Sequence, residues 1–166
     1  MEAHGGGHSE AAVTRGSVAS SVEASQHVAV SLDQNKALVR SYYHEVLTGR
    51  QRQLLDELLA PGFVSHVSGG PDVDAEGYAR AVAATHAAFA DLVVTVLDQV
   101  AEADKVVTRW SATGRQTGSF AGVPATGRVL TVTGIHIHRV SSGRLAEHWE
   151  ELDTLGALRQ LGVLSQ

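Results

Sequence analysis

A short stretch near the C-terminus carries the strongest candidate chemistry of this chain. TGIHIHRVSSGRLAEHWEELD, from Thr133 to Asp153, contains three histidines and four carboxylates. Imidazoles and carboxylates held close together can transfer protons as general acids and bases, or they can bind a transition metal ion. They can also form a hydrogen-bonded polar ladder on a solvated surface. Which of these three roles applies depends on how the secondary-structure elements position the side chains.

The stretch reads as two β-rich runs joined by the turn SSG, which predicts a β-hairpin. Gly143 suits the third position of a three-residue loop. This register pairs Val140 with Arg144, and it pairs His136 with His148. A two-residue loop would shift the pairing by one residue. We favour the first register, because turn chemistry determines register strongly.

In the favoured register, one face of the hairpin collects the histidines together with one glutamate, because side chains two apart share a face. The shifted register would instead place Trp149 opposite His136. Both faces mix polar and apolar side chains, so alternation alone does not say which face points inward. The face predicted to carry the site comprises Gly134, His136, His138, Ala146, His148 and Glu150.

A metal site at these histidines is one alternative. His136-x-His138 together with His148 supplies three imidazoles, a pattern that can hold zinc. However, His-x-His is common on strands, and the spacing to Glu147 does not suit the usual metal motif of the double-stranded β-helix. Ligand types without demonstrated convergence are weak grounds for a metal. We therefore expect no metal and no cofactor.

Three predicted helices precede four long predicted strands. The helical runs are NKALVRSYYHEVL, then RQLLDELLA, which stops before Pro61, and then DAEGYARAVAATHAAFA. GFVSHV reads as a brief extended segment, and TLGALRQLG reads as a closing helix. Helices followed by strands indicate an α+β fold, in which helices cover one face of a curved antiparallel sheet.

The length of 166 residues fits one domain, which we predict over residues 31–166. Residues 1–30 form a Gly/Ser/Ala-rich leader that we expect to be flexible. The net charge of −5 gives no electrostatic case for nucleic acid, and no basic run suggests a membrane surface. The absence of cysteine excludes disulfides and thiol chemistry and fits a cytoplasmic protein.

The segment from Arg109 to Gly162 resembles the SnoaL-like polyketide cyclases, which belong to the superfamily of nuclear transport factor 2 and ketosteroid isomerase. The pieces that carry the resemblance are GSFAGVPATGR, GIHIHRVSSGRLAEHW, Asp153 and LRQLG. Earlier pieces agree with it, namely RSYYHEVL, LLAPGFVSH and AAFADLVV. The resemblance implies an NTF2-like, cone-shaped barrel with three N-terminal helices packed on a curved, mainly antiparallel sheet. It also implies a deep pocket and a homodimer.

The resemblance implies acid–base chemistry by a pocket carboxylate, without a metal or an organic cofactor. Glu150 best matches the acid–base aspartate on the last strand of the characterised cyclases, with a reach longer by one methylene. His136 matches a pocket histidine on the preceding strand, and His66 matches another after the early extended segment. Many relatives have a histidine in the segment that corresponds to TGRQTG, where this chain has Arg115 and Gln116.

We therefore expect an enzyme that closes a ring in a polyketide or a related aromatic or polycyclic metabolite by acid–base catalysis. A hydroxylase or an isomerase in the same pocket is the enzymatic alternative, and a small-molecule binding domain is the non-enzymatic one. Glu150 is the expected acid–base, and His136 and His148 are expected to orient it or to stabilise the enolate. The expected substrate-binding residues are His66, Gln116, Tyr42, Tyr43 and Trp110, of which Tyr42 and Trp110 also fit core positions.

Overall fold

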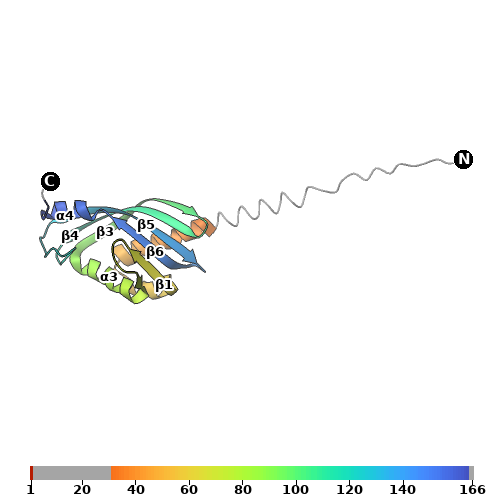
Figure 1. Ribbon diagram of the computed structural model, residues 1–166, viewed down its shortest axis with the longest axis horizontal. Helices are drawn as coiled ribbons and strands as arrows, with labels where there is room; N and C mark the ends of the chain where they lie inside the picture. Colours follow the sequence, from red (N-terminus) through yellow and green to blue (C-terminus); the bar gives the residue numbers. More distant parts are fainter. Residues whose placement is uncertain (2–30, 165–166) are drawn as a thin grey trace. The chain divides into compact units, whose positions relative to one another are not determined.

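The computed structural model describes residue 1 and residues 31–164 (Figure 1). Apart from Met1, the leader predicted over residues 1–30 lies outside the described residues. No helix of the described part is long and apolar enough to cross a membrane. The first helix is α-helical over residues 31–41. The elements after it are η1 (Tyr42–Thr48), η2 (Arg52–Leu54), α2 (Leu55–Leu58), β1 (Leu59–Val67), β2 (Val73–Asp74), α3 (Ala75–Ala88), β3 (Phe89–Glu102), β4 (Lys105–Gln116), β5 (Val129–Ser141), β6 (Arg144–Leu152) and α4 (Thr154–Leu161).

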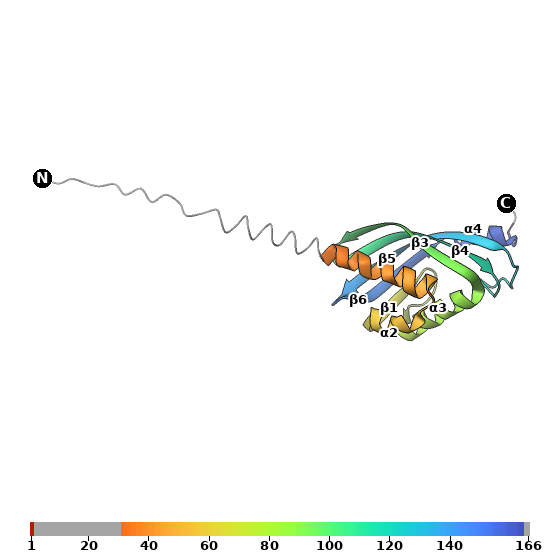
Figure 2. The ribbon, with the colours of Figure 1, turned by 180° about the vertical axis from the view of Figure 1, so that it is seen from behind.

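The strands form one six-stranded sheet in the order β2-β1-β6-β5-β4-β3. All neighbouring pairs are antiparallel except β1 and β6, which are parallel. The sheet is strongly curved; the first helix and α3 lie on its concave side, and α4 lies at one end of the sheet (Figures 1 and 2). The predicted α+β, NTF2-like class is therefore confirmed. The sheet stays open between β2 and β3, so the cone is a curved sheet and not a closed barrel.

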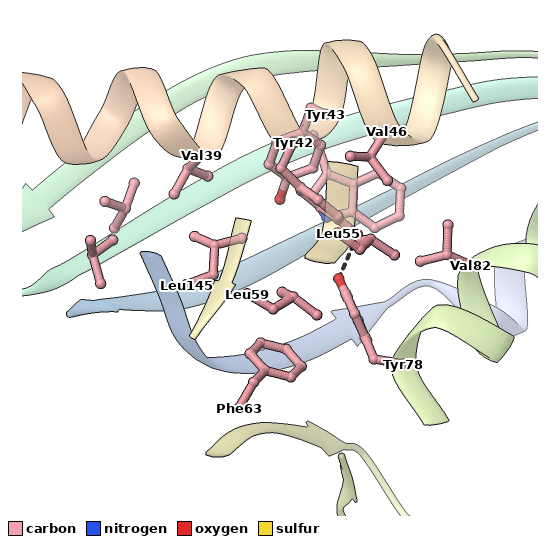
Figure 3. Close-up of a cluster of buried hydrophobic side chains, with 13 residues drawn as sticks. Val39, Tyr42, Tyr43, Val46, Leu55, Leu59, Phe63, Tyr78, Val82 and Leu145 are labelled. Atoms are coloured by element: carbon pink, nitrogen blue, oxygen red, sulfur yellow. Dashed lines mark hydrogen bonds between the residues drawn. The ribbon is translucent and has the colours of Figure 1, made fainter. Parts of the chain in front are cut away.

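The first helix covers the sheet with a buried apolar stripe. Its last part, η1, is a π-helix, a rare form that is found often at functional sites. Val39 and Val46 are fully buried, and the adjacent Tyr42 and Tyr43 are both buried between them. Figure 3 shows these side chains pointing from the helix toward the sheet. The stripe brings both tyrosines into the interior.

The second helix differs from its prediction over residues 52–60. A 3₁₀ turn, η2, is followed by only four α-helical residues, and strand β1 begins at Leu59. The backbone of Leu59 pairs with Leu145 of β6, and both side chains are buried. The helix therefore ends before Leu59 and not at Pro61, because Leu59 is buried in the core and pairs with a strand from the far end of the chain.

The β5–β6 hairpin also differs from its predicted register. Ser141 pairs with Arg144, so the loop has two residues, and both of them have left-handed φ angles: 50° at Ser142 and 71° at Gly143. Positive φ at both positions is the geometry of a two-residue hairpin turn. The predicted three-residue loop is therefore wrong.

A β-bulge next to the turn restores the predicted arrangement of side chains on the two faces of the hairpin. Val140 pairs with Leu145, whereas Arg139 pairs with Glu147, so Ala146 is an extra residue in β6. Beyond the bulge, His136 pairs with Glu150. The turn shifts the pairing by one residue, and the bulge shifts it by one more. The histidines and Glu150 consequently share a face as predicted, although the residue opposite His136 is not His148.

Candidate active site

A cavity of about 170 Å³ opens between the concave face of the sheet and the helices. Its wall is mostly apolar, and strands β3 to β6 supply most of it. Tyr42 and Tyr78 enter the cavity from the helical side, and Trp110 enters from β4. Glu150 is the only carboxylate of the lining, which contains no lysine or arginine among the described residues. An apolar cavity with a few convergent polar groups is the usual form of a small-molecule site.

Glu150 is held by its strand pairing. It lies directly opposite His136 in the β5–β6 ladder, and its Oε2 is 3.4 Å from Nε2 of His136. Its side chain is 30% exposed, so it is reachable from the cavity, whereas the His136 side chain is only 4% exposed. The arrangement gives the cavity one carboxylate with an imidazole beside it.

His136 is oriented from behind by Tyr43. The Tyr43 hydroxyl is hydrogen-bonded to Nδ1 of His136 at 2.8 Å, and the Trp110 ring packs 4.9 Å from the imidazole, centroid to centroid. These contacts leave Nε2 directed toward Glu150. Tyr43 does not line the cavity, so its place in the structure is behind His136, whereas Tyr42 and Trp110 do line it.

The paired tyrosines are the second polar feature of the cavity. The hydroxyl oxygens of Tyr42 and Tyr78 are 2.5 Å apart, as the dashed line in Figure 3 marks. Burial raises the pKa of both phenols, so both keep their protons. One proton serves the mutual hydrogen bond, and the other is free for an oxygen in the cavity. Sequence reasoning missed Tyr78, whose only signal was an aromatic residue among small ones in its helix.

His148 lies deeper than His136 and does not line the cavity. Its ring is 4.7 Å from that of His136, centroid to centroid, and its Nδ1 is hydrogen-bonded to the Ser65 hydroxyl at 2.9 Å. His138 packs against both rings. Burial lowers the pKa of His138 and His148 well below the usual histidine value, so both rings are neutral. Ser65 was not anticipated from the sequence.

The structure places His66 away from the cavity. It stacks on Trp149 on the outer face of the sheet, with its Nδ1 2.9 Å from Asp72 and its Nε2 3.5 Å from Glu147. Its position at the end of β1 agrees with the prediction, but the parallel pairing of β1 with β6 turns this side chain outward. His66 therefore does not line the cavity that Tyr42, Tyr78 and Trp110 enter.

Gln116 is also separate from the cavity. It is fully buried, and its amide nitrogen donates to the backbone oxygens of Val123 and Pro124. Its side-chain oxygen accepts from the backbone nitrogen and the hydroxyl of Thr126. Because all these bonds go to the loop after β4, Gln116 anchors that loop. Its predicted contact with substrate has no support in this geometry.

The remaining glutamates of β6 lie on the other face. Glu147 pairs with Arg139 on the neighbouring strand, and the Arg139 guanidinium lowers the pKa of that carboxyl. Glu151 is exposed, opposite Ile135. Neither carboxylate lines the cavity, so both can serve as internal controls for Glu150.

Gly134 makes room for the Trp110 wall of the cavity. A Cβ atom at this position would lie 2.7 Å from the backbone oxygen of Glu151 and closer still to Cζ2 of Trp110. Gly134→Ala should therefore reduce the free energy of unfolding by about 1–3 kcal/mol, the usual cost of overpacking. Urea unfolding followed by circular dichroism measures this. Gly70→Ala is the control, because its Cβ would meet only ordinary contacts, and equal stability of the two variants would contradict the packing argument.

Comparison with known proteins places the chain among polyketide cyclases. The sequence pattern of the SnoaL-like polyketide cyclases matches residues 37–161. The aklanonic acid methyl ester cyclase DauD of Streptomyces sp. (strain C5) is 32% identical over 113 residues, which cover 66% of this chain and 67% of that protein. DnrD, the cyclase of the same name from Streptomyces peucetius, is 30% identical over 131 residues, or 75% and 88% of the two chains. The structure of TsrD from Streptomyces laurentii superimposes with a TM-score of 0.72 and 34% identity, covering 80% of this chain and 97% of that one.

Proposed function

The chain belongs to the SnoaL-like polyketide cyclase family, and from this premise we propose that it closes a ring in an aromatic or polycyclic polyketide by cofactor-independent acid–base catalysis. Two relatives at 30% identity or more are named as cyclases of a polyketide methyl ester. The observation that carries the proposal is the cross-strand pairing of Glu150 with His136 at the wall of an apolar cavity.

The proposed reaction is an intramolecular aldol closure. The Glu150 carboxylate takes a proton from a carbon between two carbonyls, and the resulting enolate carbon attacks a third carbonyl of the same molecule. A carbon–carbon bond forms, and the new alkoxide takes the proton back from the carboxylic acid. A positioned carboxylate can perform both transfers. The product is an isomer of the substrate, so neither an oxidant nor a second substrate is consumed.

The other polar groups would stabilise the enolate and hold the base. The Tyr42–Tyr78 pair offers a phenolic proton to an oxygen in the cavity, and a donor already in place stabilises charge as it develops. His136 lies within 3.4 Å of the carboxylate and would fix its orientation, while Tyr43 fixes His136. The mostly apolar wall and the lack of cationic side chains in the lining favour a neutral, largely apolar substrate.

The first experiment is an assay on aklanonic acid methyl ester, the substrate named for the two relatives, and on a panel of related aromatic polyketide esters. We expect a product of unchanged mass with altered retention and absorbance in liquid chromatography with mass spectrometry. A product heavier by one oxygen would instead indicate a hydroxylase. Tight retention without conversion of any panel member would favour a binding domain.

We also propose that two copies associate through the convex face of the sheet. An apolar band crosses this face in register, from Val100 through Val107 and Ile137 to Trp149. Val100 is 67% exposed, and the neighbouring Ile135 is 47% exposed. Exposed apolar patches of this kind usually mark interaction sites. A second copy is the proposed partner because homodimers are the commonest oligomers and because a two-fold axis can lay the band on itself.

Val107→Asp should dissociate this dimer, because a two-fold axis would bring two buried aspartates together. Repulsion and desolvation of several kcal/mol correspond to a dissociation constant raised about 100-fold or more. Light scattering across a dilution series measures the mass. Val163→Asp, which is exposed beyond α4, is the control and should remain dimeric. A wild-type protein that is monomeric at micromolar concentration would refute the proposal.

A further inference from the structure

The three buried histidines form a cluster that the proposed acid–base chemistry uses only in part. His136 reaches the cavity, but His138 and His148 lie behind it, each about 1% exposed. We infer that this cluster is a binding site for a divalent transition metal ion, with Zn²⁺ the ion whose preferences it fits best. The site would consist of one ring nitrogen from each histidine and the carboxylate of Glu150.

The first support is convergence. One ligand nitrogen from each of the three histidines can be chosen so that all lie within 4.8 Å of one another. Tetrahedral zinc with bonds of about 2.0–2.1 Å places its nitrogen ligands roughly 3.4 Å apart. Small rotations of the imidazole rings would close the remaining gap. The two β5 histidines share a face, and the bulge in β6 brings the third opposite them, so the fold itself supplies the convergence.

The second support is unsatisfied hydrogen-bonding capacity. Within the cluster, four buried ring nitrogens have no hydrogen-bond partner: both nitrogens of His138, Nε2 of His136 and Nε2 of His148. A buried polar group without a partner costs about 1–3 kcal/mol. Four such atoms in one place are unusual in a folded protein. A metal ion would coordinate three of them at once.

The third support is the way two of the rings are anchored. The Tyr43 hydroxyl is hydrogen-bonded to Nδ1 of His136, and the Ser65 hydroxyl is hydrogen-bonded to Nδ1 of His148. When Nδ1 carries the proton and donates it to the hydroxyl, Nε2 presents its lone pair inward. Metal-binding histidines are usually oriented by such a bond on the nitrogen that does not bind the metal. His138 has both nitrogens available and can bind through either.

The donor set determines the kind of ion. Three neutral imidazoles and one carboxylate suit zinc, cobalt(II) or nickel(II), whereas magnesium and calcium require mostly oxygen ligands. Oε2 of Glu150 is 3.4 Å from Nε2 of His136 but lies outside the convergent set of three histidines, so its side chain would have to rotate to supply the fourth ligand. The cavity that His136 and Glu150 line gives the ion a path from solvent.

Metal binding would have a consequence for the proposed cyclisation, and this consequence alone rests on the proposed function. A bound ion would occupy the Glu150 carboxylate, which could then no longer take a proton. The metal-free protein would be the active form, and zinc would inhibit it. Binding itself is measured without any activity, so failure of the metal site and failure of the proposed function can be told apart.

The test uses the untagged chain, in a background of His4→Ala, His8→Ala and His27→Ala that removes the three leader histidines. We expect one equivalent of cobalt(II) to give the strong visible absorption of a tetrahedral complex and to be displaced by one equivalent of zinc. We also expect zinc to raise the melting temperature, because an ion that binds only the folded state stabilises it. Weak absorption typical of octahedral cobalt, or no saturable binding at micromolar concentration, would overturn the inference.

His138→Leu is the decisive variant, because it removes a ligand whose two nitrogens make no hydrogen bond in the described structure. The variant should fold, and its affinity for zinc should fall about 100-fold or more, since changes in the outer shell alone typically cost 10–100-fold. His44→Ala, an exposed histidine of the first helix, is the matched control and should bind as the parent does. Unchanged affinity in His138→Leu would refute the site. If this variant does not fold, the cobalt spectrum of the parent protein decides the question.

Discussion

Glu150→Gln is expected to lower the turnover number about a hundredfold or more, with little change in substrate affinity or melting temperature. The substitution keeps the shape of the side chain and its place opposite His136, but it removes the base. A positioned general base typically contributes 10²–10⁴-fold to the rate. Steady-state kinetics on the best substrate of the ester panel measure the effect. Glu150→Asp should recover part of the rate, because it retains the carboxylate.

Glu147→Gln and Glu151→Gln are the matched controls, because both lie on the convex face of the same strand. Each should retain turnover within about twofold, although Glu147→Gln loses its bond to Arg139. The two side chains of that pair are half-buried at the surface, where ion pairs contribute little to stability. If either control loses its activity while Glu150→Gln keeps full turnover, the assignment of the base is wrong.

The free energy of unfolding is expected to fall steeply below about pH 6.5. Burial lowers the folded-state pKa of His138 and His148 well below the usual value of 6.5. Above pH 6.5 both are neutral in the folded and unfolded chain, so stability is fully present there. As the pH falls, His138 and His148 become protonated in the unfolded chain but stay neutral in the folded chain. The expected loss is up to about 2.7 kcal/mol per pH unit, until the folded-state pKa values are reached.

Urea unfolding between pH 7.5 and pH 5, with a chelator present, measures this slope. His138→Leu supplies the control, because it removes one of the two histidines and should lower the slope by up to about 1.4 kcal/mol per pH unit. Carboxylates contribute little in this window, because Asp and Glu titrate mainly below pH 5. A flat stability profile down to pH 5 would show that the two rings are protonated as easily in the folded chain as in the unfolded one.

The predicted effect of Glu150→Gln and the predicted pH dependence of stability both depend on the bulge at Ala146. A two-residue turn without a bulge would leave Glu150 and His148 on the face opposite to His136, because a shift of one residue moves every side chain to the other face. The bulge restores the shared face and places Glu150 directly across from His136. A single extra residue in β6 therefore decides whether the carboxylate lies in the cavity or outside it.

Local sequence patterns predicted most of the secondary structure and the α+β class. The four long strands lie where β-rich runs alternate with turn residues, and Asp153 caps α4 by accepting from the backbone nitrogen of Gly156. The resemblance to the SnoaL-like family, carried by the last two strands, predicted the NTF2-like architecture. These features depend on residues close together in the chain, so a single sequence suffices to predict them.

Only the tertiary structure decided which candidate residues meet. The helices cover the concave face, and this makes the histidine face of the hairpin the inner one. Tyr78 and Ser65 join the site from α3 and β1, although no catalytic motif surrounds either of them in the sequence. His66 and Gln116 lie outside the site. The pairing of β1 with β6 turns the His66 side chain outward, and Gln116 is hydrogen-bonded to the loop after β4. These outcomes depend on contacts between segments far apart in the chain, and alternation or turn chemistry within one segment cannot encode them.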